Sequence, residues 1–441
     1  MQNIIIRLSF FFLLLSFGKL YALNFKETDE IGRKILQSFV DKDFKSIEAR
    51  VDSVYRNSYL STTLEKDWAE LTGTYGKYLN SRSVNFEKSP YYNFIAYKIN
   101  FEYLPYLLNL SFNEKGKIIY LSFMEAHKVY YAQDYVDVSK FTDQKFSLIY
   151  KEFELQGLLS VPNQEGKVPL VVIIGEAGPT DKDGSYDENK PYKDLAWGMA
   201  SKGYAVYRFD KRVISYGIYL LRDKNSYTPF TCREEYLEDI YNALDTLERL
   251  PFIDLNRIYV LGHGEGGILT PLVAKERKEV KGIILLGANS KRTQEMMIDQ
   301  YAYLSTVSPN KKQEYDEQTQ KAIRSMDKNL NPLTEHYKMP YEVQATYWIW
   351  LNKYKHLEMA KKQTKPILIL HGNRDYQVNM ENLKIWQKTL GDHSNVTIKS
   401  YPKLNHLFYP GEVASTYSEY FMKSNIPDYV LKDITDWLST H

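Results

Sequence analysis

Apolar positions follow two different rhythms along the chain, and the first of them covers residues 24–125. Helical spacing comes first and strand-like alternation follows, in segments 30–40 and 64–79 and then 93–103, 106–112 and 117–123. Residues 113–116 join the last two strands, and a hairpin is predicted there because Gly116 can take a positive φ. Helices followed by antiparallel strands predict a small α+β domain.

The region 143–441 has a different pattern, in which strands and helices alternate. It opens with two short segments, 146–150 and 155–161, that are expected to pair as a hairpin. Residues 168–174 are continuously apolar, which is typical of a strand buried on both faces. Further strands are expected at 204–209, 257–261, 280–286, 366–370 and 396–401, and helices at 193–202, 234–250, from 265 onward and at 429–438. Repeated βα units predict a mostly parallel, doubly wound sheet.

Residues 290–360 interrupt this alternation with a helical stretch that is polar and aromatic. Ligands of open α/β sheets bind outside the carboxyl ends of the strands, and an insertion after a strand lies at that end. We therefore interpret residues 290–360 as a cap that covers a substrate. The alternative is a peripheral helical decoration whose aromatic residues simply pack down. Residues 126–142 are interpreted as the linker between the two regions.

The N-terminus carries an apolar run at residues 8–17, after a positively charged start and before Leu20-Tyr21-Ala22. This order is typical of a signal peptide over residues 1–22, and the run is too short to span a bilayer. An uncleaved N-terminal anchor is the alternative. No other stretch approaches 18 continuous apolar residues, so we expect an exported protein, periplasmic or secreted, without stable membrane insertion after cleavage.

Charge and cysteine content exclude several classes of function. The 57 basic and 55 acidic residues give a net charge of +2, so there is no electrostatic reason to expect nucleic acid as a partner. Cys232 is the only cysteine, so neither an intramolecular disulfide nor a thiolate metal site can form. The eight histidines lack a ligand spacing such as H-E-x-x-H, and neither a metal nor another cofactor is expected. The oligomeric state stays open.

The segment Gly262-His263-Gly264-Glu265-Gly266 follows a predicted buried strand and opens a predicted helix. It resembles the nucleophile elbow G-x-S-x-G of α/β-hydrolases, with Gly264 at the nucleophile position. Gly262 and Gly266 allow strand and helix to approach closely, and Gly264 can adopt the strained conformation of such a turn. Glycines after a strand can also cradle a dinucleotide pyrophosphate. However, this motif lies in the middle of the α/β region rather than in its first βα unit.

Two residues further along the chain resemble the other members of a hydrolase triad. Asp375 follows the predicted strand 366–370, and His406 follows the predicted strand 396–401. Each alone is equally well explained as a turn residue or a loop histidine. Together they give the order nucleophile, acid, histidine that is typical of the fold. Over residues 145–441 the chain thus resembles bacterial secreted esterases with a small N-terminal domain, which implies an α/β-hydrolase fold.

The loop 174–183 resembles the G-S-G-P-x-D-R-D loop that follows the third strand in those esterases. The resemblance implies an oxyanion hole formed by the backbone N–H groups of Ala177 and Glu265. Glu176 stands where a small residue is usual, and its carboxylate would repel an oxyanion unless it is turned away or paired with Lys or Arg. Residues 210–213 read D-K-R-V, against D-K-R-G in the family.

Gly264 has no hydroxyl group, so no acyl-serine can form at this position. The resemblance implies a carboxylic-ester hydrolase for small ester or acyl substrates, here acting through a water that His406 and Asp375 activate. One alternative is an exported pseudoenzyme that binds an acylated ligand or a protein partner. Another is a peptidase-like relative without its nucleophile, and a laboratory substitution of serine would also explain Gly264. Three residues outside the elbow are not expected to replace the nucleophile: Ser215, Ser290 and Cys232.

Overall fold

The computed structural model describes residues 23–88, 92–102, 105–125, 130, 132–151, 153–216 and 230–441. The chain divides into two compact units, residues 1–129 and residues 130–441. The predicted signal peptide, residues 1–22, lies outside the described residues. Among the residues that the structure describes, no helix combines the length and the apolar character needed to cross a membrane.

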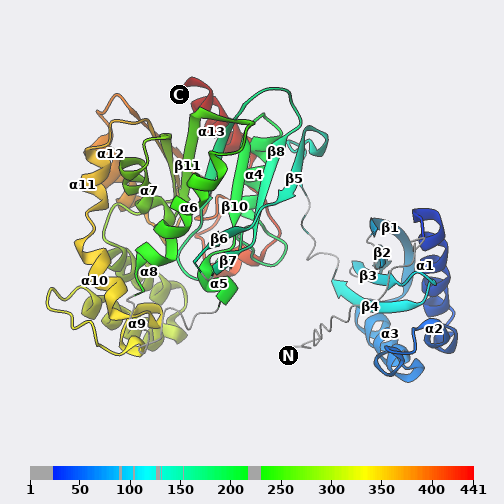
Figure 1. Cartoon of the computed structure of the whole chain (residues 1–441). Helices are drawn as coiled ribbons and strands as arrows, with labels where there is room; N and C mark the ends of the chain where they lie inside the picture. The colour runs from blue at the N-terminus through cyan, green and yellow to red at the C-terminus, as the bar shows by residue number, and fades with distance from the viewer. Residues whose placement is uncertain are drawn as a thin grey trace. The chain divides into compact units, whose positions relative to one another are not determined.

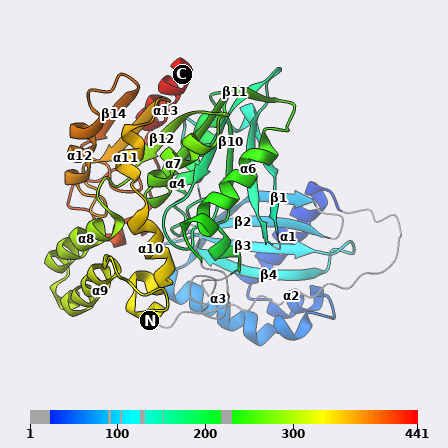
Figure 2. The same cartoon turned by 60° about the vertical axis from the view of Figure 1, so that its left-hand side comes forward.

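The first unit is a four-stranded antiparallel sheet with its helices on one face (Figures 1 and 2). Its elements are α1 (Phe25–Val40), α2 (Phe44–Arg50), η1 (Arg56–Ser58), α3 (Ser61–Tyr75), β1 (Tyr78–Lys88), β2 (Asn93–Phe101), β3 (Pro105–Phe112) and β4 (Ile118–Glu125). Phe39 of α1 and Trp68 of α3 pack on the inward residues of the strands, such as Ile95. Strand β1 was not predicted, because its sequence is mostly polar and it pairs only with β2.

The second unit is built on an eight-stranded sheet with the order β14-β13-β12-β11-β9-β10-β8-β5. All strands from β14 to β10 run parallel, and β8 and β5 are antiparallel at one edge. The strands are β5 (Phe141–Lys145), β8 (Gly157–Pro162), β9 (Val168–Ile174), β10 (Ala205–Phe209), β11 (Ile253–His263), β12 (Val280–Leu286), β13 (Ile367–Gly372) and β14 (Val396–Tyr401). The predicted fold class, a mostly parallel sheet after a small α+β domain, is confirmed.

The predicted opening hairpin of this unit is wrong. Strand β8 pairs with β5, whereas β6 (Leu148–Tyr150) pairs with β7 (Phe153–Leu155) in a separate ribbon. Lys151 takes a positive φ of 53° between β6 and β7 and reverses the chain earlier than expected. The alternating pattern of 146–150 suits either partner equally, so the pattern alone could not select the pairing.

Helices cover both faces of the large sheet (Figure 1). Val171 and Ile173 of β9 pack toward α4 (Pro191–Ala200) and α13 (Asp428–Thr440), whereas Leu170 and Val172 face the opposite layer. This alternation follows from the two-residue period of a strand. The opposite layer contains α6 (Glu238–Leu247), α7 (Glu265–Glu276) and α12 (Met380–Leu390). Short helices are η3 (Val138–Lys140), α5 (Arg212–Tyr216), the π-helix η5 (Arg233–Leu237) and η9 (Tyr417–Phe421).

The insertion between β12 and β13 is helical, as its sequence predicts. It contains α8 (Thr293–Val307), η6 (Pro309–Lys311), α9 (Lys312–Ser325), η7 (His336–Lys338), η8 (Pro340–Glu342), α10 (Ala345–Lys353) and α11 (His356–Lys361). Tyr347 and Trp348 of α10 are buried in the same apolar core as α6 and α7. The aromatic residues therefore fasten the insertion to the sheet layer, and its role as a substrate cover stays a prediction.

Candidate active site

The turn after β11 has the geometry of a tight strand-to-helix elbow. Gly264 has φ 52° and ψ −119°, a conformation that side chains disfavour strongly. A Cβ added to Gly262 would lie 2.4 Å from the carbonyl oxygen of Gly266. A Cβ added to Gly266 would lie 2.4 Å from the carbonyl oxygen of Gly175. The three glycines of the motif thus allow β11, α7 and the loop after β9 to lie close together, because a side chain at any of these positions would clash.

His406 and Asp375, which lie 31 residues apart, are brought together at the carboxyl ends of β14 and β13. His406 Nδ1 lies 2.6 Å from Asp375 Oδ2, and both side chains are fully buried. Asp375 Oδ1 accepts hydrogen bonds from the backbone N–H groups of Gln377 and Val378, each at 2.8 Å. The carboxylate is therefore held from both sides and fixes the orientation of the imidazole.

Glu176 occupies the other side of the imidazole. Its Oε2 lies 2.7 Å from His406 Nε2, and a Cβ on Gly264 would lie only 2.8 Å from its Oε1. The Glu176 carboxylate thus fills the space beside the turn into which a side chain at position 264 would project. The sequence analysis considered lysine or arginine as partners of this carboxylate, and in the structure its hydrogen-bond partner is instead the imidazole of His406.

The charges in this cluster alternate. Both ring nitrogens of His406 face carboxylate oxygens, which can only accept, so both nitrogens carry a proton. Burial lowers the pKa of His406, but the charges of Asp375 and Glu176 outweigh burial and raise it well above its ordinary value. Burial raises the pKa of Glu176, but the charge of His406 is the largest of the influences that lower it, to about 2. His406 thus lies between two carboxyl groups and carries a proton on each ring nitrogen.

His263, the residue before the turn, links the two loops of the site. Its Nε2 lies 2.9 Å from the carbonyl oxygen of His406, which can only accept, so Nε2 carries the proton. Its Nδ1 accepts from the Tyr192 hydroxyl at 3.0 Å, and the Tyr192 oxygen accepts from the backbone N–H of Glu176 at 2.9 Å. Burial, then the charge of His406, lowers the pKa of His263 to about 4, so it is neutral. This chain of bonds sets the distance between the Glu176 and His406 backbones.

Comparison with known proteins gives a family for each unit. Residues 183–412 match the family described as serine aminopeptidase, S33, and residues 32–121 match a family described as a protein of unknown function (DUF3887). The chain is 32% identical over 330 residues to Esterase EstD of Thermotoga maritima, covering 75% of each chain. The larger unit belongs to the α/β-hydrolases of the serine aminopeptidase family.

Two solved structures are also similar to the chain. Est1E from Butyrivibrio proteoclasticus is 18% identical and has a TM-score of 0.45, with 67% of this chain and 99% of that chain covered. A putative dipeptidyl aminopeptidase IV from Bacteroides ovatus is 16% identical and has a TM-score of 0.46, with 82% of this chain and 44% of that chain covered.

The side chain of Glu265, the residue after the turn, is held by two tyrosine hydroxyls. Glu265 begins α7, and the first N–H groups of a helix have no partner within the helix. Its carboxylate accepts from the hydroxyls of Tyr347 at 2.8 Å and Tyr236 at 3.1 Å. Burial, and then the charge of Glu235, raise the pKa of Glu265 to about 7. Only the backbone of Glu265 therefore belongs to the predicted oxyanion hole, which it would share with Ala177.

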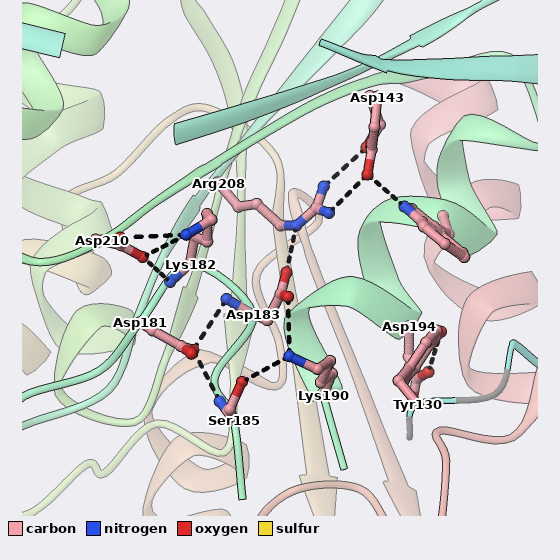
Figure 3. Close-up of polar contacts among 12 residues, drawn as sticks. Tyr130, Asp143, Asp181, Lys182, Asp183, Ser185, Lys190, Asp194, Arg208 and Asp210 are labelled. Carbon is pink, nitrogen blue, oxygen red and sulfur yellow. Dashed lines mark hydrogen bonds and ion pairs between the residues drawn. The ribbon is translucent and has the colours of Figure 1, made fainter. Parts of the chain in front are cut away.

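Buried ion pairs anchor the loop that carries Glu176 (Figure 3). Arg208 of β10 donates from Nε to Asp183 at 2.9 Å, from Nη1 to Ser160 at 2.8 Å and from Nη2 to Asp143 at 3.0 Å. Asp183 also pairs with Lys190 at 3.2 Å. Because Asp183 lies seven residues after Glu176 in the same loop, the Arg208 cluster fixes the far end of that loop to β5, β8 and β10.

The D-K-R-V segment after β10 anchors both ends of the same loop. Asp210 pairs with Lys182 at 3.2 Å (Figure 3). Lys211 is buried, and its Nζ donates to the main-chain oxygen of Glu176 at 2.8 Å and pairs with Glu235 at 2.7 Å. Lys211 thus holds the backbone of Glu176 and leaves its carboxylate to His406.

Aromatic side chains flank the acid loop of the site. Tyr376, next to Asp375, stacks on Tyr420 with ring centroids 6.0 Å apart, and Tyr186 lies 5.3 Å from Tyr420. Tyr417 and Phe421 extend this group into solvent. Burial, and then the negative charge of Glu176, raise the pKa of Tyr186, so the group lies within electrostatic reach of the cluster.

The residues set aside as replacement nucleophiles have other roles or positions. Ser290 is buried and donates its hydroxyl to the carbonyl oxygen of Asn382 at 2.9 Å. Cys232 is buried, and burial raises the pKa of its thiol. Ser215 lies on the short helix α5 and is exposed.

Sequence reasoning missed His263 and Tyr192, and it treated Glu176 only as a defect. The one available signal for His263 was its position inside the glycine motif. Among the described residues, the donor atoms of Glu176, His263 and His406 lie within 4.8 Å of one another, close enough to surround a metal ion. In the structure these atoms form hydrogen bonds instead, and the imidazole proton of His406 occupies the line toward Glu176.

Proposed function

We propose that this chain hydrolyses small carboxylic esters or related acyl compounds at the His406–Asp375 pair, with Gly264 at the nucleophile position. The esterase relative of Thermotoga maritima supports the substrate class. The reaction proceeds without an acyl-serine, because Gly264 offers no hydroxyl group.

One observation carries this proposal: a line of three groups, Asp375, His406 and Glu176, with contacts of 2.6 and 2.7 Å. In a serine triad, the histidine nitrogen opposite the aspartate bonds to the serine hydroxyl. Here the carboxylate of Glu176 makes that contact with His406 Nε2, and the turn residue, Gly264, has no side chain. His406 therefore holds a proton at Nε2, and it can deliver this proton to the oxygen of a leaving alcohol.

The experiment compares the protein without residues 1–22 with its His406→Ala variant on phenyl acetate and phenyl butyrate. A chelator is present in all assays, so that stray metal ions contribute no rate. We expect His406→Ala to lose at least about 100-fold in kcat, as general acid–base catalysis commonly contributes about 10²–10⁴-fold. Equal rates for the two proteins would contradict the proposed function.

The variant that restores serine chemistry needs two substitutions. A serine Cβ at position 264 would meet the Glu176 carboxylate at 2.8–3.3 Å, so Gly264→Ser alone displaces Glu176 from His406. In Gly264→Ser with Glu176→Ala the hydroxyl has room to bond to His406. We expect a fluorophosphonate probe to label only this double variant, on the introduced serine hydroxyl, while wild type stays unlabelled.

A pseudoenzyme that binds an acylated ligand is the second candidate. The observation that favours it is that both ring nitrogens of His406 contact carboxylate oxygens, which leaves neither nitrogen free to act as a base. It predicts binding of a short acyl ligand, measured by calorimetry, without turnover of its ester. Hydrolysis by wild type that depends on His406 would exclude it.

A further inference from the structure

We propose that Glu176 is a catalytic general base whose oxygen Oε1 takes a proton from the water that attacks the ester carbonyl. His406 then serves as the acid that protonates the leaving alcohol. This inference rests on the proposed hydrolytic function, and it names the group that replaces the missing serine.

The two oxygens of the Glu176 carboxylate differ in their surroundings. Oε2 is engaged, 2.7 Å from His406 Nε2 and 3.5 Å from His263 Nδ1. Oε1 has no hydrogen-bond donor among the residues that the structure describes, and it is not sealed from solvent. The side chain is 18% exposed, so water can reach this oxygen. One oxygen therefore fixes the carboxylate, and the other is open for chemistry.

The open oxygen lies where an attacking group belongs. Oε1 is 2.8 Å from the place of a Cβ on residue 264, beside the apex that carries the nucleophile in α/β-hydrolases. The two predicted oxyanion donors adjoin it, since Ala177 follows Glu176 and Glu265 follows Gly264. A water bonded to Oε1 therefore lies next to a carbonyl carbon whose oxygen points at these N–H groups.

The hydrolytic step balances with water as the only co-reactant. An O–H bond of the water breaks, its proton goes to Glu176 Oε1, and the water oxygen bonds to the carbonyl carbon. The tetrahedral intermediate then expels the alcohol, and the proton of His406 Nε2 goes to the leaving oxygen. The products are a carboxylic acid and an alcohol. Proton exchange with solvent returns Glu176 to the carboxylate and His406 to the imidazolium.

The acid and the base of this pair strengthen each other during the step. Burial raises the pKa of Glu176, and the charge of His406 is the largest influence that lowers it. As His406 gives its proton to the alcohol, that charge disappears and the Glu176 carboxylate becomes more basic. The proton from the water is therefore bound more tightly at the moment when the leaving group departs.

The rigid backbone of Glu176 supports the assignment. Its N–H donates to Tyr192, and its carbonyl oxygen accepts from Lys211 at 2.8 Å and from Tyr236 at 3.2 Å. Both main-chain groups are thus held by buried side chains. These hydrogen bonds hold the Glu176 carboxylate in a fixed position, as a general base requires.

The test compares wild type, Glu176→Gln and a matched control, Glu276→Gln, on phenyl acetate with a chelator present. Glu276 lies on α7 and accepts a hydrogen bond from a half-buried tyrosine, Tyr241. Glutamine keeps the size of the side chain but cannot take a proton from water. We expect kcat to fall by about 10²–10³-fold for Glu176→Gln with KM within about threefold, and to stay unchanged for Glu276→Gln.

A second variant and a trapping measurement complete the design. Added formate can occupy the space that Glu176→Ala vacates beside Gly264. We expect it to raise the kcat of this variant at least about tenfold over the value without formate. Quenched-flow mass spectrometry of wild type is expected to show no acetyl adduct. An adduct on Glu176 would overturn the general-base role in favour of direct attack.

Failure of this inference differs from failure of the proposed function. Full kcat in Glu176→Gln, combined with loss of activity in His406→Ala, would overturn the role of Glu176 and leave the hydrolase intact. Absence of any turnover that depends on His406 in wild type would instead remove the proposed function itself. Equal circular dichroism spectra and urea midpoints among the variants show that each of these results concerns the site and not the fold.

Discussion

The Arg208 cluster and the His406 cluster, both in the larger unit, each place one cation between two carboxylates. In the first, Arg208 uses its nitrogens on Asp183, Asp143 and a hydroxyl, so the guanidinium meets an acceptor on each side (Figure 3). In the second, His406 lies between Asp375 and Glu176, but one oxygen of Glu176 stays open beside a strained glycine. The saturated cluster holds strands and a loop together, whereas the open cluster keeps an atom available for a proton.

The largest expected effect is on the saturated cluster. Arg208→Ala leaves Asp183 buried and Asp143 partly buried without their cation, and removal of one partner of a buried pair costs about 3–5 kcal/mol. The free energy of unfolding, measured with urea at pH 7, should fall by this amount. Lys312→Ala removes a fully solvated ion pair with Asp316 and serves as the control without measurable change. A loss below about 1 kcal/mol for Arg208→Ala would mean that the cluster is not structural.

A second prediction concerns Glu265, the carboxylate near the turn that has tyrosine hydroxyls in place of a cation. Its pKa is raised from 4.5 to about 7, so the folded state holds its proton more tightly than the unfolded state does. The stability that this group contributes is fully present below pH 4.5 and is lost as the pH rises toward 7, by about 3 kcal/mol.

The variant Glu265→Gln should remove this pH dependence. We expect the difference in unfolding free energy between wild type and variant to change by about 3 kcal/mol between pH 4.5 and pH 8 in urea titrations. A constant difference would show that Glu265 is already ionised in the folded protein at low pH.

The smallest expected effect is the pH dependence of kcat, and it tests the His406 cluster directly. The proposed mechanism needs Glu176 ionised, above a pKa of about 2, and His406 protonated, below its raised pKa. We therefore expect kcat on phenyl acetate to change less than about threefold from pH 7 to pH 5 and to fall at alkaline pH. Among the described residues, the titratable and charged groups that face this pair include Asp375, His263, His371, Lys211, Tyr186, Tyr192, Tyr341, Tyr376 and Tyr420.

The double variant Gly264→Ser with Glu176→Ala is the reference for this profile. It needs a neutral histidine as base, so its kcat should drop more than about tenfold from pH 7 to pH 5. The same drop in wild type would show that His406 acts there as a base and not as an acid.

Much of the larger unit could be predicted, because its central strands are rich in apolar residues. β12 and β14 agree with the predicted ranges to the residue. The polar edge strand β1 escaped detection, since it has only one neighbour and its sequence shows little alternation. The short ribbon of β6 and β7 could not be predicted, because the choice of partner depends on a turn at Lys151.

The site was predictable only where it follows a motif. Asp375 and His406 could be placed from their order after consecutive strands, and the structure brings them within 2.6 Å of each other. The role of Glu176 depends on a contact over 230 residues of sequence, and no local pattern encodes such a contact. Tyr192 and His263 are single residues whose meaning comes entirely from their neighbours in space.

The mutual exclusion of side chains at positions 264 and 176 also constrains how this protein can evolve. A serine that arises at 264 meets the carboxylate of Glu176, and a small residue that arises at 176 leaves His406 facing an empty space beside glycine. A serine nucleophile at this turn therefore requires a change at both positions together.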